Sequence, residues 1–114
     1  MSDQELADKI VAHGVGRIVG YDDRGQERVV LYRVDREVGT PPEKFVRDWR
    51  VAGAMIEKCM PIGHSFAIRS NEVDIAEGGF DQGSWSYGEQ AANVMVDDSL
   101  PRAINEACAK ALSA

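Results

Sequence analysis

An apolar stripe at helical spacing in the middle of the chain constrains the fold more than any other feature of the sequence. Its members, in order, are Phe45, Trp49, Ala52, Ile56 and Cys59. This spacing predicts a helix with one face buried in a core. The helix should begin at Thr40–Glu43, which has the pattern of a capping box with a proline in the first turn, and should end before Pro61. We therefore predict one continuous helix with Trp49 in the core.

Two further helices are predicted near the ends of the chain. Ser2 and Glu5 have the spacing of a capping box, and a helix over residues 3–13 should then stop at Gly14, because glycine enters the left-handed conformation at little cost. Ser99 is the predicted N-cap of the closing helix. The apolar stripe of that helix is Leu100, Ile104, Ala107, Cys108 and Ala111.

A β-hairpin is predicted between the first two helices. Arg17–Tyr21 and Glu27–Val34 are rich in β-branched and aromatic residues, and Asp22–Gly25 between them has the composition of a turn. The second strand has apolar residues on both faces. We therefore expect it to lie in the centre of a sheet, with helices covering both sides.

Two more strands are predicted before the closing helix, at His64–Arg69 and at Ser84–Tyr87, and the segment 70–83 between them is predicted to be a loop or a wide hairpin connection. The order of elements becomes α-β-β-α-β-β-α. This order predicts an α+β fold in which a four-stranded, mainly antiparallel sheet forms the middle of an α/β/α layered sandwich. A chain of 114 residues fits one domain, and we assign residues 1–114 to it.

Three segments of the chain have a recognisable pattern. Residues 48–58 read DWRVAGAMIEK, residues 84–86 read SWS, and residues 99–104 read SLPRAI and are followed by spaced alanines. Together they resemble the phage ABA sandwich domain family, which comprises small phage and prophage accessory proteins of unknown function. The resemblance implies a layered α/β/α sandwich and a phage or prophage origin, and it implies no established activity. The segment Gly20–Glu37 is longer and more charged than the pattern of that family.

The negative net charge of the chain makes some classes of binding partner unfavourable. A formal net charge of -6 disfavours direct binding of nucleic acid, which needs clustered Lys and Arg, and it disfavours docking on anionic lipid. No apolar run approaches the roughly 18 to 20 residues that span a bilayer. The first residues, Met1–Glu5, are acidic and polar, unlike a secretory signal. We expect a protein of the bacterial host cytoplasm that does not enter the membrane.

Cysteine and histidine offer the first candidate chemistry. Cys59 and His64 lie five positions apart across a predicted helix end, so a thiol with its base is one alternative. Together with His13 and Cys108 they are too scattered for a zinc site, which needs three or four ligands at close spacing. We expect both cysteines to be reduced, small buried hydrophobes.

Glycines and paired carboxylates offer the remaining candidates. Gly14–Gly20 resembles a nucleotide-binding loop, but it follows a helix and enters a strand, the reverse of what phosphate binding requires. Asp22 with Asp23, and Asp97 with Asp98, are acidic pairs at a turn and a helix start, where Asp is common for structural reasons. We accordingly predict no catalytic residue, no metal ligand and no cofactor.

One feature points to a partner. Residues 70–101 contain seven acids and no Lys or Arg, and this one-sign stretch is either a solvated loop or a surface that steers a basic partner. The candidate partner-binding residues are Glu72, Asp74, Glu77, Asp81, Trp85 and Glu89.

The sequence therefore leaves three hypotheses about function. The first is a small phage accessory protein that binds a host or phage protein, such as an antiviral defence complex, in a basic groove that otherwise holds nucleic acid. The second is a homo-oligomer that serves phage structure or assembly. The third is a small enzyme with a pocket lined by Cys59 and His64 or by the carboxylate pairs.

Overall fold

A computed structural model of the chain describes residues 1–32, 38–60, 64–69, 71–77, 80–81, 84–85 and 90–113. Of residues 77, 80, 81, 84 and 85 only the backbone is described. The helices are α1 (Asp3–Ala12), α2 (Pro42–Phe45), α3 (Trp49–Cys59) and α4 (Leu100–Ser113). The strands are β1 (Gly16–Tyr21), β2 (Glu27–Leu31), β3 (His64–Ile68), β4 (Glu72–Glu77), β5 (Phe80–Asp81), β6 (Ser84–Trp85) and β7 (Gln90–Met95).

The fold is α+β with antiparallel sheets, as predicted, but the predicted single four-stranded sheet is wrong. The described strands form a hairpin of β1 and β2, a three-stranded sheet in the order β3-β4-β7, and a short hairpin of β5 and β6. The element order is also longer than α-β-β-α-β-β-α, because one helix is divided and three strands were missed.

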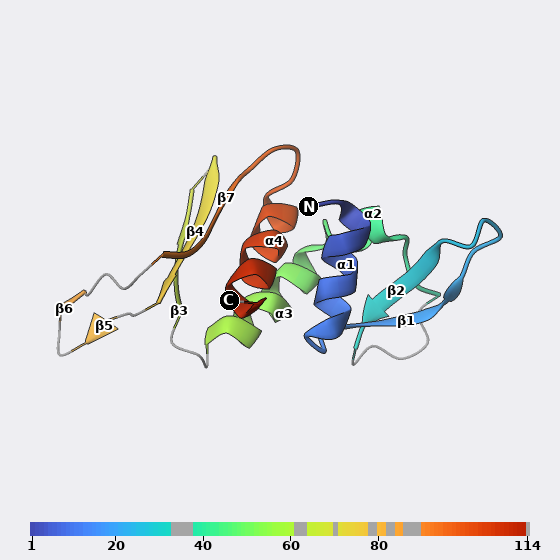
Figure 1. Cartoon of the computed structure of the whole chain (residues 1–114), viewed down its shortest axis with the longest axis horizontal. Helices are drawn as coiled ribbons and strands as arrows, with labels where there is room; N and C mark the ends of the chain where they lie inside the picture. Colours follow the sequence, from blue (N-terminus) through green and yellow to red (C-terminus); the bar gives the residue numbers. More distant parts are fainter. Residues whose placement is uncertain are drawn as a thin grey trace.

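The layers are arranged in the opposite way from an α/β/α sandwich. Helices α3 and α4 pack together, α4 covers β4 and β7, and α1 and α2 contact β1 and β2. Figure 1 shows the result, in which the helices lie in the middle and the β1–β2 hairpin and the three-stranded sheet lie at opposite sides of them. The molecule is therefore elongated, with extents of 53 × 27 × 21 Å.

Strand β2 lies in a two-stranded hairpin and not in the centre of a larger sheet. Val29 and Val30 are both buried, which agrees with the two apolar faces seen in the sequence. The predicted central position is wrong, however. The second edge of β2 is covered by a single bridge from the chain at Thr40, whose backbone N–H donates to the Val29 carbonyl at 3.0 Å and whose carbonyl accepts from Val29 N–H at 2.9 Å. That bridge occupies the edge on which another strand would pair.

The predicted central helix is interrupted at Asp48. The backbone there is extended, with φ -82° and ψ 126°, and the Asp48 side chain accepts from the Arg50 N–H at 2.8 Å as the N-cap of α3. Thr40 caps nothing, because the N-cap of α2 is Pro41 and no side chain bonds to it. The interruption separates the two halves of the apolar stripe, so α3 buries Val51, Ala52, Met55 and Cys59.

Trp49 is therefore not a core residue, and 60% of it is exposed. Trp49 is the first residue of α3. Because the helix starts anew there, Trp49 does not continue the apolar stripe that begins at Phe45. Ile56 packs partly buried against the core, as the stripe predicted.

Strands β4 and β7 lie in segments without a predicted strand. In β4, Val73 and Ile75 are fully buried and alternate with Glu72 and Asp74, which is the period of a half-buried strand. The prediction of a loop or a wide hairpin connection over 70–83 is wrong for this part, which forms a strand. Strand β3 and the short β6 fall within the predicted ranges.

The first and last helices are confirmed. The Ser2 hydroxyl accepts from Glu5 N–H at 3.1 Å, and Gly14 has φ 80° at the helix stop. The Ser99 hydroxyl accepts from Arg102 N–H at 3.2 Å. One hydrophobic cluster runs from α1 through both larger sheets to α4. Among the described residues, no helix combines the length and apolarity needed to cross a bilayer.

The division of the central helix predicts that truncating Met55 and truncating Trp49 have different effects on the free energy of unfolding. We expect Met55→Ala to lower the free energy of unfolding by about 2–5 kcal/mol, because Met55 is fully buried and its loss leaves a cavity. We expect Trp49→Ala to cost about 1 kcal/mol or less, because most of the ring is in water. Urea unfolding of both variants measures this, and equal losses would contradict the break at Asp48.

Candidate functional site

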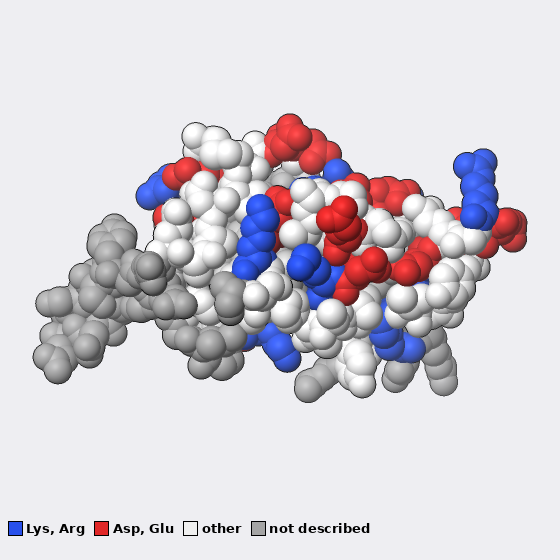
Figure 2. Space-filling model, viewed as in Figure 1, with Lys and Arg blue, Asp and Glu red and all other residues white. Residues whose placement is uncertain are grey.

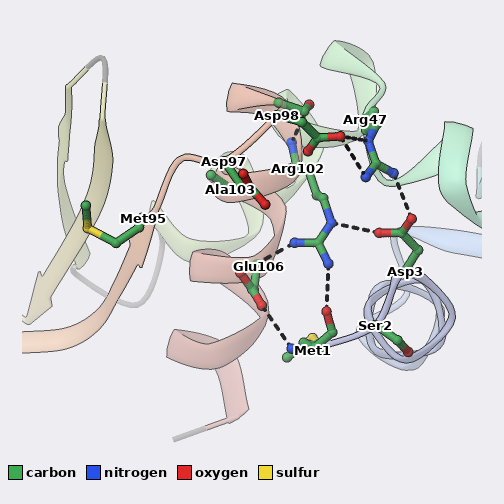
Figure 3. Close-up of a pocket in the computed structure, with 11 residues that line it drawn as sticks. Met1, Ser2, Asp3, Arg47, Met95, Asp97, Asp98, Arg102, Ala103 and Glu106 are labelled. Carbon is green, nitrogen blue, oxygen red and sulfur yellow. Dashed lines mark hydrogen bonds and ion pairs between the residues drawn. The ribbon is translucent and has the colours of Figure 1, made fainter.

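A charged pocket of about 550 Å³ lies where three chain-distant segments meet. The segments are the start of α1, the α2–α3 junction and the loop between β7 and α4. The pocket is lined mainly by charged and polar residues, and its charged groups are shown in Figure 3. We call these residues the arginine cluster: Met1, Asp3, Arg47, Asp98, Arg102 and Glu106.

Asp3 lies between the two arginines of the cluster (Figure 3). Its Oδ2 accepts from Arg47 Nη1 at 2.8 Å, and its Oδ1 accepts from Arg102 Nε at 2.7 Å. Partial burial opposes ionisation of Asp3, but the hydrogen bonds from Arg102 and Arg47 outweigh it and hold the pKa of the Asp3 carboxyl below its ordinary value. Asp3 is therefore a charged bridge at neutral pH.

Arg47 takes its place from the break in the central helix. Its Nη1 also donates to the Glu43 carbonyl at 2.7 Å, and its Nε donates to Asp98 Oδ2 at 3.1 Å. The adjacent Val46 carbonyl, left free by the end of α2, accepts from Asn105 Nδ2 of α4 at 2.9 Å. Asn105 is fully buried, so the junction that carries Arg47 is anchored to α4.

Arg102 completes the cluster on the first turn of α4. Its Nη2 donates to the Met1 carbonyl at 2.7 Å, and its Nη1 lies 3.6 Å from Glu106 Oε2. Glu106 is buried and its Oε1 also lies 3.6 Å from the terminal amine of Met1. Every nitrogen of both guanidinium groups thus has a partner within the protein.

This geometry makes the arginine cluster a clamp. A guanidinium that binds an incoming anion needs donors that face it, and here each nitrogen already faces Asp3, Asp98, Glu106 or a backbone carbonyl, the contact of Arg102 Nη1 with Glu106 being an ion pair at 3.6 Å. The cluster ties the start of α1 and the α2–α3 junction to the start of α4. The pattern was invisible in sequence analysis because its members come from positions 1 to 106.

The sequence-predicted partner residues are only partly brought together. Glu72 and Asp74 lie on the same face of β4, opposite the buried Val73 and Ile75. Glu72 forms an ion pair with Arg69, and Asp74 accepts from Gln90 Nε2 at 2.7 Å. For Glu77 in β4, Asp81 in β5 and Trp85 in β6 the backbone position alone is described, and Glu89 lies outside the described residues.

The candidate thiol–imidazole pair does not form. The Cys59 thiol is directed at the Cys108 carbonyl oxygen, 3.9 Å away, while His64 Nδ1 lies 3.4 Å from the Cys59 carbonyl oxygen. His13, at the C-cap of α1, contacts the Ser113 hydroxyl at 3.4 Å. Within the described parts of the chain, no group of three or more His, Cys, Asp or Glu is placed to hold a metal ion.

A second acidic surface was missed by the sequence analysis. It consists of Asp8, Glu27 and Glu43, and we call it the amide-held acidic face. Gln4 Nε2 donates to Asp8 Oδ1 at 3.0 Å and to Glu27 Oε2 at 2.7 Å. Gln26 Nε2 donates to Glu43 Oε2 at 3.0 Å.

Figure 2 shows acidic atoms over α1, α2 and the β7–α4 loop. None of the three acids of the amide-held acidic face forms an ion pair with a Lys or Arg among the described residues. No local pattern in the sequence indicates this face, because α1, β2 and α2 each supply one of its members.

Comparison of the chain with protein-family models, with curated proteins and with solved structures finds no match.

The bridge at Asp3 predicts a pH-dependent stability. Because the Asp3 pKa is depressed in the folded protein, its contribution is present above 3.8, the ordinary value, and is lost as pH falls through the folded value. We expect Asp3→Asn to cost about 1 kcal/mol at pH 7, and we expect this cost to fade as the pH falls below 3.8.

Asp97→Asn is the matched control, since Asp97 lines the same pocket but forms no ion pair with a described residue. Its free energy of unfolding should follow that of the parent protein across the pH range. A loss for Asp3→Asn that stayed constant down to pH values well under 3.8 would contradict the ionic bridge.

Proposed function

We propose that this protein acts by binding a macromolecular partner with a basic surface, and that the amide-held acidic face is the main docking surface. The observation behind the proposal is that Asp8, Glu27 and Glu43 are positioned by the neutral amides of Gln4 and Gln26. A neutral donor orders a carboxylate without cancelling its charge, whereas an arginine does both.

Ordered but unneutralised charge suits recognition of a basic partner. Fixed carboxylates lose little conformational freedom on binding, which lowers the entropic cost of the complex. Their summed field steers an oppositely charged partner and raises the association rate. The net charge of -6 strengthens this field and disfavours direct contact with nucleic acid or anionic lipid.

The partner we propose is a host or phage protein in the cytoplasm of a bacterium. Its basic groove would be one that otherwise holds nucleic acid, and an antiviral defence complex is the leading candidate class. This part of the proposal rests on the resemblance of residues 48–58, 84–86 and 99–104 to phage ABA sandwich proteins and on the acidic charge.

Glu72 and Asp74, on the face of β4 opposite the buried Val73 and Ile75, are a secondary docking surface in this proposal. Asp74 is held by the amide of Gln90 and keeps its charge, whereas Glu72 is paired with Arg69 and contributes less. Glu77, Asp81, Trp85 and Glu89, the other acids and the tryptophan of the sequence-predicted set, remain candidate residues of this proposal.

The test begins with capture of bacterial host proteins on the parent protein, and the captured partner is then titrated in purified form. We expect the variant Asp8→Asn/Glu27→Gln/Glu43→Gln to weaken binding by at least about tenfold, and the parent complex to weaken steeply as salt is raised. Duplex nucleic acid should compete with the protein for the partner if the groove assignment is right.

Two control variants separate the surfaces. Asp23→Asn/Glu57→Gln removes exposed charges elsewhere and should leave affinity nearly unchanged. Glu72→Gln/Asp74→Asn tests the sheet face and should have a smaller effect than the triple variant. The docking variant removes three charges and each control removes two, so losses in proportion to the charges removed would mean that net charge alone matters and would contradict the proposal. An affinity insensitive to all three variants would also end it.

A homo-oligomer is the second candidate function, and exposed apolar side chains favour it. Val38 is 87% exposed and Tyr21 is 67% exposed at the end of the molecule formed by the β1–β2 hairpin, and each is a large apolar group in water. Light scattering at several concentrations decides between the candidates. The docking proposal predicts a monomer, and a dimer that Val38→Ser dissociates would favour assembly instead.

A further inference from the structure

One edge of β3 is open for pairing. Among the described strands, β3 pairs with β4 alone and ends the three-stranded sheet (Figure 1). The Arg69 N–H donates to the Glu72 carbonyl at 2.9 Å, and bonded pairs alternate along an antiparallel ladder, so the backbone groups of Ala67 also face β4. Those of Phe66 and Ile68 therefore face away from it. No described residue supplies a backbone partner on that side.

The inner face of the sheet is incompletely covered at this edge. Phe66 and Ile68 share that face with their register partners Ile75 and Val73, which are fully buried. Helix α4 packs on β4 and β7, whereas Ile68 is 44% exposed and Phe66 is only partly buried. A further strand on this edge would bury apolar surface and also satisfy the open backbone groups.

The outer face beside the same edge is first small and then acidic. Ala67 is paired with Asp74 on this face, and the neutral Gln90 amide holds Asp74 at 2.7 Å without cancelling its charge. Neighbouring strands lie about 4.8 Å apart, so only the small Ala67 side chain would separate an added strand from Asp74. Lys and Arg have the length and the charge to cross it. Arg69, paired with Glu72, repels a cation at the far end.

The edge of β7 suits a further strand less well. Its inward side chains Ala92 and Val94 are already buried, so pairing there covers little more apolar surface. The register between β4 and β7 also shifts at Ile75–Ala76, whereas the register between β3 and β4 is continuous. Natural edge strands are often blocked by Lys, Pro or a bulge. Strand β3 has none of these along His64–Ile68.

We propose that an extended basic segment of the partner adds to the open edge of β3 as a fourth strand of the sheet. Its alternate apolar side chains would lie beside Phe66 and Ile68, and its Lys or Arg side chains would pass over Ala67 toward Asp74. Main-chain hydrogen bonds would supply affinity, and the alternating side chains would supply specificity. This inference rests on the proposed function, since the basic partner is the one proposed above.

The experiment measures amide hydrogen exchange by NMR in the labelled full-length protein, with a capped peptide of alternating lysine and valine as the probe. Without peptide, the Phe66 and Ile68 amides should exchange faster than the Ala67 amide, which is bonded to β4. At saturation, the peptide should slow exchange at Phe66 and Ile68 at least about tenfold. A peptide of alternating glutamate and valine is the matched control and should bind at least about tenfold more weakly.

Methylation of the peptide backbone tests strand pairing directly. In an antiparallel complex the valine N–H groups of the peptide face Phe66 and Ile68, and in a parallel complex the lysine N–H groups do. Methylation of one of these two sets should therefore abolish the protection, although charge and side chains are unchanged. Protection that survives both methylations would show that the peptide binds by charge alone, and the proposal would be overturned.

Two variants place the peptide on the sheet. Ile68→Pro removes an outward N–H without removing a bond to β4 and should abolish peptide binding. Asp74→Asn should weaken binding about two- to fivefold, and Glu72→Gln should weaken it less because Arg69 already pairs with Glu72. If Ile68→Pro does not fold, the methylated peptides decide on the parent protein.

This test is separate from the test of the amide-held acidic face. It needs no captured partner, and Asp8→Asn/Glu27→Gln/Glu43→Gln should still show peptide protection at β3. Protection without an effect of that triple variant on partner binding would end the docking face and leave the strand site. The strand site is overturned if saturating peptide leaves Phe66 and Ile68 unprotected, or protects the β7 edge instead, whatever the triple variant does.

Discussion

The burial of α4 is the constraint on which the rest of the structure depends. Every residue from Ala103 to Ala109 is buried, because the helix lies between the three-stranded sheet on one side and α1 and α3 on others. A helix enclosed in this way needs small side chains for close approach, and α4 supplies alanines and a cysteine. Its polar members need partners inside the protein: Asn105 Nδ2 donates to the Val46 carbonyl and Glu106 joins the arginine cluster, whereas the buried Asn105 Oδ1 has no hydrogen-bond partner among the described residues.

The break at Asp48 is the second decisive feature, and it depends on α4. Asn105 Nδ2 donates a hydrogen bond to the Val46 carbonyl, which the end of α2 leaves without a helical partner. The chain can therefore leave α2 and start α3 in a new direction. That change of direction presents Arg47 to Asp3 and Asp98 and turns Trp49 outward. One buried amide thus connects the helix break, the arginine cluster and the exposed tryptophan.

The charges of the protein fall into two kinds that have different consequences. In the arginine cluster each carboxylate meets a cation, so the charges hold chain segments together and leave little field outside. In the amide-held acidic face glutamines orient the carboxylates, so order is gained while the negative charge is retained. Only the amide-held acidic face produces a negative electrostatic field that can attract a basic partner, and the docking proposal therefore rests on it.

Local chemistry in the sequence determined the helix caps at Ser2 and Ser99, the stop at Gly14, the β1–β2 turn and the α+β class, because each depends on residues within a few positions. The tertiary structure decided the number of sheets, the division of the central helix and the charged surfaces. Strand β4 was missed because its exposed face is acidic and resembles a loop, although Val73 and Ile75 alternate correctly. The arginine cluster joins residues up to and beyond 101 positions apart and the amide-held acidic face joins residues 23 positions apart, and no local pattern specifies contacts over such distances.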